Sequence, residues 1–533
     1  MVTINNNIVL FQSKNQTRKL FEVAECLDFT IDENNGDIYA NIDTTYEQAM
    51  ISFISMFFPG TMDPDTKRAL RAAYDAIKEE RMKSILALPW GERLRPYQSE
   101  AIVNMMGRKH NLLCFDMRLG KTQTAFSLAA SLGHKKVMYV SPANIKYSNY
   151  KDLVENWGYD PTHFTLKDAS KSRSFKAFFM NENYMFINYD IISKNMKDIE
   201  EFAPDHIIYD EVHHIKTDST RKTRNVKALY DMLPNAHTVG LSGTPMANRV
   251  IDLYSFMHLT GHNLGKNKAA FSREFVLEED GRAVGVQNVD MLRAKMSNFM
   301  IRRTKKNSGY HFPPEVISKI YFEVSDYREE YDDAMKKISQ LSSDVDSITL
   351  NAHLMTLNRY NSYAKTPGAI EFLESIIEAG GKPVVATLFH DTLTALEKHF
   401  GTRSIRIDGS VSGQARDGLR KKFTSDDSVQ IALCQMAAGS EGVDMSVSND
   451  FVFLDFPWVP RLIQQMCARG SRQGKEESIN IYFLIVPDTI DERIYSVVVD
   501  KADDINAVID GNSKESVKYG DLPRQILQEL IKK

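Results

Sequence analysis

The sequence predicts an α/β protein with two parallel-sheet lobes, a helical insertion between them and a small N-terminal α+β domain. Its 533 residues are enough for three or four folding units. A hydrophobic share of 43% beside 26% charged residues is typical of a globular chain with real cores. Short apolar runs separated by helical stretches occur in two blocks, and this rhythm is typical of parallel βαβ units.

The first unit expected is an accessory domain over residues 1–90. Ile4–Phe11 and Asp37–Ile42 have the pattern of strands. Thr45–Phe58 and Asp65–Leu88 are amphipathic and predict helices. These residues carry no recognisable chemistry, so either a substrate-choosing or a stabilising role fits them.

The remaining boundaries follow from the two blocks of apolar runs. We expect a first lobe over 91–260, a helical protrusion and linker over 261–370, a second lobe over 371–498 and a helical brace over 499–533. The strands predicted for the first lobe are Leu112–Phe115, Val137–Val140, Tyr184–Ile187, His206–Tyr209 and Thr238–Leu241. Those predicted for the second are Pro383–Leu388, Ser404–Ile407, Val429–Leu433, Phe451–Leu454 and Ile479–Ile485.

Charge and cysteine usage exclude several classes of protein. The net charge is −4, so a nucleic acid would have to be bound by local basic patches. The cysteines lack CxxC spacing, which argues against structural zinc or a disulfide framework and fits a reducing compartment; they are Cys26, Cys114, Cys434 and Cys467. The sequence shows neither a membrane-spanning stretch nor a secretory signal pattern. We therefore expect a protein of the cytoplasm (of a bacterium or a virus-infected host) or of the nucleus.

A candidate phosphate site follows the run Leu112–Phe115. The next residues, Asp116 to Thr122, end in Gly-Lys-Thr and lead into a helical stretch. Loop amides and a helix N-terminus can hold phosphate oxygens, Lys121 can reach the β- and γ-phosphates, and Thr122 can ligate Mg²⁺. Phe115 stands where the Walker pattern has Gly, so a plain helix start with a capping glycine is the alternative.

A pair of carboxylates about 90 residues later supports the phosphate site. Asp210 and Glu211 follow the apolar run His206–Tyr209. At the end of a parallel strand they would face the phosphate crevice, where Asp210 can hold Mg²⁺ and Glu211 can orient water. A solvated loop is the alternative. His213 has no suitably spaced co-ligands, so we interpret it as a hydrogen-bonding coupler.

A third motif, Leu241-Ser242-Gly243-Thr244-Pro245, also follows an apolar run. The hydroxyls of Ser242 and Thr244 can bridge to the carboxylate segment and respond to the nucleotide. An ordinary Gly-Pro turn is the alternative.

In this order the motifs resemble those of the Swi/Snf-type DNA translocases of helicase superfamily 2. Arg95–Gln98 is similar to the family's Q motif, Asp210–Lys216 to its DEAH box, Leu241–Asn248 to LTGTPLQN and Met300–Lys305 to MLRRTK. Arg118 departs from the pattern, which usually has Gly there. The resemblance implies that both lobes are RecA-like.

The second block carries the matching motifs. Arg406–Gly409 is the typical RIDG, Gly439–Asp444 resembles motif V, and Asp455–Pro460 resembles D-x-x-W-N-P. Gln465–Lys475 is similar to Q-x-x-x-R-x-H-R-x-G-Q. Ser471 replaces the His and Lys475 the last Gln, while Arg469 and Arg472 are kept.

The resemblance implies a set of functional residues. The catalytic group would be Lys121, Asp210, Glu211 and two arginine fingers, Arg469 and Arg472. ATP would contact Arg95, Gln98 (which reads adenine), Leu119, Gly120, Lys121, Thr122 and Gln123, and Mg²⁺ would contact Thr122 and Asp210. Coupling would run through His213, Ser242, Thr244, Gly439 and Gly442. DNA would contact Pro142, Lys146, Tyr189, Arg303, Thr387 and His390.

The function that follows is that of an ATP-dependent translocase. It would hydrolyse ATP on duplex or branched DNA, with little sequence preference, to remodel, reanneal or clear it. Two alternatives stay open: a strand-separating DNA or RNA helicase, and a nucleotide-gated DNA-binding scaffold with weak turnover. We expect a monomer with no membrane partner.

Overall fold

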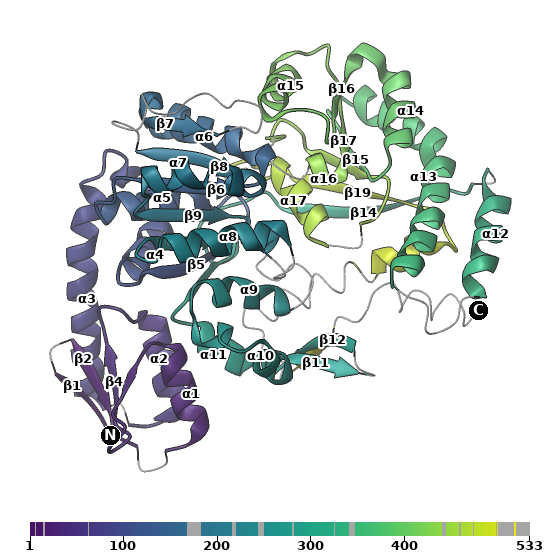
Figure 1. Ribbon diagram of the computed structural model, residues 1–533. Coiled ribbons are helices and arrows are strands. Elements are labelled where there is room, and N and C mark those ends of the chain that lie inside the picture. The colour runs from purple at the N-terminus through teal and green to yellow at the C-terminus, as the bar shows by residue number, and fades with distance from the viewer. Residues whose placement is uncertain are drawn as a thin grey trace. The chain divides into compact units, whose positions relative to one another are not determined.

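The computed structural model (Figure 1) describes most of the chain. The described residues are 1–5, 7–13, 16–61, 63–167, 183–215, 220–243, 250–279, 282–324, 326–340, 347–439, 444–457, 460–472, 474–496, 498 and 516–518. No helix in those ranges is both long enough and apolar enough to cross a bilayer. The chain forms two compact units, the first of Met1–Leu277, Val286–Ser308 and Ala507–Val517, and the second of Glu278–Gly285, Gly309–Asn506 and Lys518–Lys533.

The N-terminal domain belongs to the first unit and is α+β, as the sequence predicts. Its antiparallel sheet has the order β1-β2-β4-β3. The strands are β1 (Val2–Asn5), β2 (Ile8–Phe11), β3 (Thr30–Ile31) and β4 (Ile38–Asn41), and the helices are α1 (Arg18–Cys26), α2 (Glu47–Phe57) and α3 (Pro64–Leu86). The stretch expected as one strand is a hairpin of β1 and β2, in which Asn5 pairs with Ile8. Asparagine favours such tight turns.

The core of this domain is aromatic. The ring centroids of Phe53 lie 5.1 Å from Phe11 and 5.0 Å from Phe29, both in edge-to-face geometry. Phe58 packs on Phe11 at 5.2 Å. Each ring buries a large apolar area, so these few residues supply a core for a short chain.

The first lobe is a seven-stranded parallel sheet of order β13-β5-β10-β9-β6-β8-β7. Its strands are β5 (His110–Phe115), β6 (Val137–Ser141), β7 (Phe164–Leu166), β8 (Tyr184–Asn188), β9 (His206–Asp210), β10 (His237–Leu241) and β13 (Met300–Arg303). Its helices are α4 (Pro96–Met106), α5 (Lys121–Ser131), α6 (Ala143–Trp157), α7 (Met196–Phe202), α8 (Arg221–Met232) and α9 (Ile251–Leu259). Figure 1 shows these helices flanking the strands. The five strands predicted from apolar runs are all present.

The second lobe is a six-stranded parallel sheet of order β14-β19-β18-β15-β17-β16. Its strands are β14 (Glu315–Tyr321), β15 (Val384–Thr387), β16 (Ser404–Ile407), β17 (Ile431–Gln435), β18 (Asp450–Phe453) and β19 (Ile479–Ile485). Its helices are α12 (Arg328–Ser339), α13 (Ser347–Glu378), α14 (His390–Phe400), α15 (Gly413–Ser425), α16 (Met436–Gly439) and α17 (Pro460–Gly470). Two parallel sheets with their helices confirm the predicted fold class.

The segment 261–370 differs from its expected description as a helical protrusion and linker. It does contain α10 (Lys268–Phe275) and α11 (Val289–Met296), but also β11 (Val276–Glu279) and β12 (Arg282–Gln287). Its strand β13 is one edge of the first lobe sheet, and its strand β14 is one edge of the second. Both strands contain charged residues, which hides them from a search for apolar runs; β13 is half-buried, and β14 is mostly exposed along its length.

Of the expected C-terminal helical brace, 499–533, the structure describes only 516–518. These residues form a strand, β20 (Ser516–Lys518), in a three-stranded sheet of order β11-β12-β20.

A buried asparagine joins the N-terminal domain to the first lobe. Asn298, which is fully buried just before β13, accepts a hydrogen bond from the backbone N of Tyr46 at 2.7 Å. Its amide donates to the backbone oxygen of Leu27 at 2.8 Å. The hydroxyl of Tyr46 in turn donates to Asn111, the second residue of β5. The N-terminal domain is thus hydrogen-bonded to Asn298, just before β13, and to the second residue of β5, the strand that leads into the phosphate loop.

We expect Asn298→Ala to lower the free energy of unfolding of the first unit by about 2 to 3 kcal/mol, because it leaves buried backbone groups without partners. Hydrogen exchange of β1, β2 and β5 peptides measures the effect. Asn156→Ala is the matched control, since this asparagine is exposed on α6 and its side chain donates to Asp152 at 2.7 Å. Equal protection in the two variants would contradict the prediction.

Candidate nucleotide site

The phosphate loop connects β5 to α5 at the carboxyl edge of the first sheet. Lys121 is the first residue of α5. Its ammonium donates to the backbone oxygens of Phe115, at 3.0 Å, and Asp116, at 3.5 Å. The loop therefore wraps around the lysine, and its α5 N-terminus presents backbone amides beside that charge.

Two loop residues have left-handed backbone conformations. Gly120 has φ of 75° and Arg118 has φ of 70°. A glycine adopts this conformation without steric cost, whereas an arginine does not. The resemblance expects a glycine at position 118, and the backbone there does have the left-handed conformation that glycine favours. In this chain Arg118 adopts that conformation instead.

These two positions should respond oppositely to substitution. Arg118→Gly is expected to stabilise the protein by about 0.5 to 1 kcal/mol. It removes the steric cost of a left-handed arginine, and this gain exceeds the loss from the greater conformational entropy that glycine gives the unfolded chain. Gly120→Ala is expected to destabilise it by about 1 to 2 kcal/mol. An added Cβ there would also lie 2.5 Å from Nε2 of Gln98. Thermal unfolding with and without ATP measures both; effects of the same sign would contradict the prediction.

Gln98 connects the start of α4 to the phosphate loop. Its Oε1 accepts from the backbone N of Arg95 at 2.9 Å, and its Nε2 donates to Gly120 O and Thr124 Oγ1, each at 3.2 Å. The hydroxyl of Tyr97 donates to the backbone oxygen of Leu119 at 3.1 Å. The Q-like motif thus fixes the loop itself, and a contact with adenine remains a prediction.

The carboxylate pair lies at the same sheet edge as the loop. In the sheet β10 lies between β5 and β9, and Leu241 at its end is paired with Asp210 and with Leu113. A Cβ added to Gly243, just past β10, would lie 3.5 Å from Nζ of Lys121. Three neighbouring strands therefore bring Lys121, the Asp210–Glu211 pair and the Ser242–Gly243 turn together.

The charges of the site perturb one another. Burial lowers the pKa of the Lys121 ammonium, and nearby carboxylates, first those of Glu211 and Asp210, oppose that shift. Burial, and next the charge of Glu211, raise the pKa of Asp210. Titratable groups whose pKa values are shifted by burial and by one another's charge are candidates for a functional site.

Two side chains that the sequence analysis did not single out bind Asp210. The hydroxyl of Tyr139, on β6, donates to Oδ2 of Asp210. The amide of Asn149, on α6, donates to the same oxygen at 3.2 Å and also to the Tyr139 hydroxyl. The backbone N of Glu211 donates to Oδ1 at 2.9 Å. A tyrosine in the middle of an apolar strand is a weak sequence signal, and Asn149 gave none.

A second unanticipated contact holds the loop to β13. Arg302 lies 2.7 Å from Oδ1 of Asp116, and the backbone N of Lys305 donates to Oδ2 at 2.9 Å. The backbone N of Asp116 donates to Arg303 O at 2.8 Å. The MLRRTK-like segment is therefore part of the nucleotide lobe.

The other predicted residues of this lobe have varied positions. His213 is buried, with Nδ1 3.1 Å from Oε2 of Glu211, which fits a coupler. Ser242 is buried beside the loop, and its backbone N donates to Leu113 O at 3.2 Å. Gln123 points away from the loop: it is buried and donates to Ser127 at 3.2 Å, so its expected contact with ATP does not fit its position. Thr244 lies outside the described residues.

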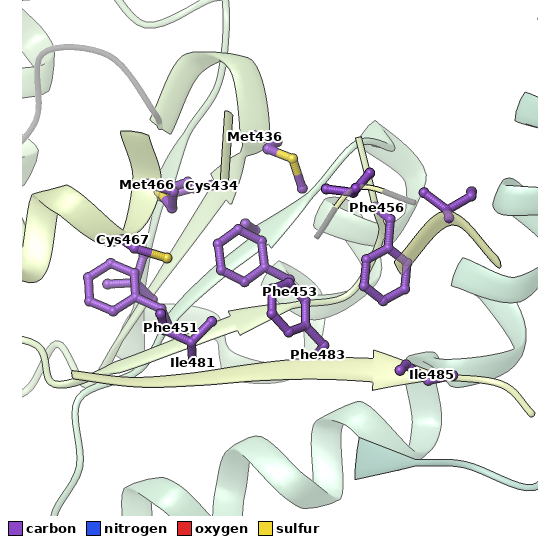
Figure 2. Close-up of a cluster of buried hydrophobic side chains, with 14 of the residues drawn as sticks. Cys434, Met436, Phe451, Phe453, Phe456, Met466, Cys467, Ile481, Phe483 and Ile485 are labelled. Carbon is purple, nitrogen blue, oxygen red and sulfur yellow. The ribbon is translucent and has the colours of Figure 1, made fainter. Parts of the chain in front are cut away.

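In the second unit, α17 carries the predicted arginine Arg469, and Arg472 follows it as an exposed residue. Figure 2 shows the core beneath this helix, where Cys467 and Met466 lie over the β18 and β19 side chains. The rings of Phe453 and Phe483 stack there with centroids 5.2 Å apart. This core fixes the helix that carries Arg469 and that ends two residues before Arg472.

Two glycines allow the close packing around α17. A Cβ at Gly439, the end of α16, would lie 2.7 Å from Cε of Met466, and one at Gly470 would lie 2.3 Å from the Phe451 ring. Gly439 is thus needed for the packing of the motif V segment on the motif VI helix, whereas Gly442 lies outside the described residues. Lys475, which replaces the family's Gln, donates to Ser446 O at 2.9 Å and Ser448 O at 2.8 Å.

Comparison with known proteins places these motifs in a family. The SNF2-related domain matches residues 97–367, and the helicase conserved C-terminal domain matches residues 368–474. The chain belongs to the SNF2-related family. The members of this helicase-type family are ATP-dependent enzymes. The first match covers the phosphate loop and the carboxylate pair, and the second covers α17.

Individual relatives are distant. The chain is 25% identical over 460 residues to an uncharacterized ATP-dependent helicase of Mycoplasma pneumoniae (81% of this chain, 44% of the relative). It is 22% identical over 473 residues to the DNA annealing helicase and endonuclease ZRANB3 of Bos taurus (84% and 44%). It thus spans less than half the length of these two relatives. The Sulfolobus solfataricus SWI2/SNF2 ATPase core in complex with dsDNA is 20% identical, with a TM-score of 0.37, over 79% of this chain and 93% of that one.

Most SNF2 positions expected to contact DNA are occupied by buried side chains in this chain. Pro142 is buried at the start of α6, and Lys146 is buried and donates to Lys167 O. Tyr189 is buried and donates to Asp210 O at 2.7 Å, while Thr387 is buried and donates to Asp455. Contacts between DNA and these side chains do not fit their burial, because each hydroxyl or ammonium already has a partner inside its own lobe.

The two remaining positions are more accessible. Arg303 forms an ion pair with Glu100 of α4 and is partly exposed. The side chain of His390, the first residue of α14, is 58% exposed. Exposed basic residues also occur on α8, at Arg221 and Arg224, and on α15, at Lys421 and Lys422.

Proposed function

We propose that this SNF2-family chain is an ATP-dependent translocase that hydrolyses ATP on duplex or branched DNA, to remodel, reanneal or clear it. The observation that carries the proposal is the group formed by Lys121, Asp210 and Glu211 at the ends of neighbouring parallel strands. A lysine in a glycine-containing loop beside two carboxylates is suited to phosphoryl transfer, which depends mainly on positioning and charge stabilisation.

In this proposal each residue of the group has one role. Lys121 binds the β- and γ-phosphates, and Glu211 orients the attacking water. His213 is the coupler, and its Nδ1 lies 3.1 Å from Oε2 of Glu211. Arg469 and Arg472 act as the arginine fingers, since a guanidinium stays charged and its planar fork matches phosphate oxygens.

The residues present fit Mg²⁺. Asp210 and Thr122 offer carboxylate and hydroxyl oxygens, the hard ligands that Mg²⁺ prefers. Among the described residues no group of three or more His, Cys, Asp or Glu side chains is arranged to hold a metal. Mg²⁺ needs no such group, because it usually takes one or two carboxylates together with substrate phosphates. When bound, it neutralises charge that develops on the phosphates.

The DNA part of the proposal rests on local charge and on a relative. The exposed basic residues of α8 and α15 can bind phosphates without reading sequence, although the chain as a whole is slightly acidic. One of the two relatives described above is named as a DNA annealing helicase and endonuclease. Steep salt dependence and little sequence preference follow from backbone binding.

The test measures phosphate release with duplex DNA, single-stranded DNA and RNA, for the parent and for Lys121→Ala. Stimulation by duplex or branched DNA that Lys121→Ala abolishes is the expected result. Stimulation by RNA alone would overturn the DNA assignment. Displacement of an annealed strand would indicate a strand-separating helicase instead.

A nucleotide-gated scaffold with weak turnover is a second candidate, favoured by the loop departures at Phe115 and Arg118. It predicts ATP-dependent DNA binding without DNA-stimulated phosphate release in the parent. Measurement of both quantities in one preparation separates the two functions.

A further inference from the structure

The hydroxyl of Tyr139 and the amide of Asn149 form a small buried network on one oxygen of Asp210. Both groups donate to Oδ2, and Asn149 also donates to the Tyr139 hydroxyl, so the three side chains form a closed triangle. The triangle joins β6, α6 and β9, three separate elements of the lobe. Its geometry does not depend on a single loop.

This network leaves the other oxygen of Asp210 in a defined place. Oδ1 accepts only the backbone N of Glu211 among the hydrogen bonds that the structure describes, at 2.9 Å. A carboxylate oxygen has capacity for more than one partner. The carboxylate is therefore held through Oδ2 by two side chains, while Oδ1 has capacity for a further partner.

The environment of Tyr139 shows that its ring has a packing role that can be separated from its hydroxyl. The ring centroid lies 4.6 Å from that of Phe186 and 5.8 Å from that of Phe126. A phenylalanine at this position would keep these contacts and remove only the hydrogen bonds. The chain also offers a matched residue: the Tyr209 hydroxyl, one position before Asp210, is buried and makes no hydrogen bond within the described part of the chain.

We propose that Tyr139 and Asn149 are positioning residues that set the orientation of the Asp210 carboxylate for a Mg²⁺–nucleotide complex. The inference rests on the proposed function, since it deepens the role of Asp210 there. Side chains that orient metal-binding groups typically change metal affinity or activity by about 10- to 100-fold when removed. Neither residue belongs to a motif that the sequence analysis used.

The test compares Tyr139→Phe and Asn149→Ala with the parent and with Tyr209→Phe. The first readout is the binding of a fluorescent, non-hydrolysable ATP analogue in excess Mg²⁺ and in EDTA. In EDTA we expect the two positioning variants to bind the analogue with the same affinity as the parent. In excess Mg²⁺ we expect them to bind it about 10-fold more weakly than the parent. The second readout is phosphate release against Mg²⁺ concentration, where the half-saturating Mg²⁺ should rise by a similar factor.

The outcomes separate this inference from the proposed function. Tyr209→Phe should gain as much affinity for the analogue from Mg²⁺ as the parent does. If Tyr139→Phe and Asn149→Ala also gain as much as the parent, the positioning role is wrong and the proposed function stands. If the parent gains nothing from Mg²⁺, the proposed function fails and the inference with it. Asn149→Ala removes a half-buried side chain at a helical position, so it carries the test if Tyr139→Phe fails to fold.

Discussion

Replacing Glu211 by Gln is expected to lower ATP turnover by about 10²- to 10⁴-fold, while nucleotide binding changes little. The amide keeps the shape of the side chain but cannot accept a proton or hold the charge that orients water. The backbone of Glu211 has φ of 50°, and Nδ1 of His213 lies 3.1 Å from Oε2 of its carboxylate. A non-glycine residue in that conformation at a strand end is typical of a functional position. Phosphate release at saturating ATP and DNA measures the effect.

Glu201→Gln is the control for this change. Glu201 lies on α7, is exposed, and belongs to none of the site motifs. Its replacement makes the same change of charge and should leave turnover within about twofold of the parent. A Glu211→Gln protein that keeps more than about a tenth of the parent rate would show that another group orients the water.

The fold could be predicted to the level of single strands because buried parallel strands are continuous apolar runs. His206–Tyr209 and Ile479–Ile485 are such runs, and both lie inside their sheets. The same rule missed β13 and β14, because they carry charged residues such as Arg302 and Lys319, and it missed β7, which is only three residues long. Each lobe sheet therefore includes one strand from residues 261–370, the segment that the sequence predicted to be a helical protrusion and linker.

The candidate site could be predicted where residues with suitable side chains come at or soon after the ends of predicted parallel strands. Lys121, Asp210 and Glu211 follow strands whose carboxyl ends must meet, so sequence order was sufficient. Tyr139 and Asn149 could not be found this way, because their contact depends on how α6 packs against the sheet. The burial of Lys146 and Tyr189 has the same origin: a family position gives a residue's place along the chain but not the direction of its side chain.

A buried ion pair in the second unit is expected to give the largest stability effect in that lobe. Lys365, on α13, lies 2.7 Å from Asp491, and both side chains are fully buried. The ammonium also donates to the backbone oxygens of Leu454 and Leu484, the latter at 2.9 Å. Asp491 further accepts from Asn361 at 2.9 Å and from the backbone N of Val486 at 3.1 Å. The pair therefore bonds α13 to the segments that follow β18 and β19.

Lys365→Met is expected to lower the stability of the second unit by about 3 to 5 kcal/mol, because it leaves the Asp491 charge buried without its counter-ion. Hydrogen exchange of β18 and β19 peptides measures the loss, and the β6 and β9 peptides of the first unit serve as the internal control. Asp491→Asn should cost a similar amount, since it leaves the ammonium without its carboxylate. Unchanged protection in β18 and β19 would contradict the prediction.

The double variant decides whether the cost comes from the isolated charge or from lost packing. Lys365→Met with Asp491→Asn removes both charges and keeps an oxygen that can accept from Asn361 or Val486. If isolated charge is the cause, the double variant should be more stable than either single variant, with a coupling free energy of about 1 to 3 kcal/mol. If the lost hydrogen bonds to Leu454 and Leu484 dominate, the double variant should be as unstable as Lys365→Met or more so. Because neither residue belongs to the nucleotide group of the first unit, ATP binding by Lys121 and its neighbours should be unaffected in all three proteins, which separates the stability of the second lobe from the chemistry of the first.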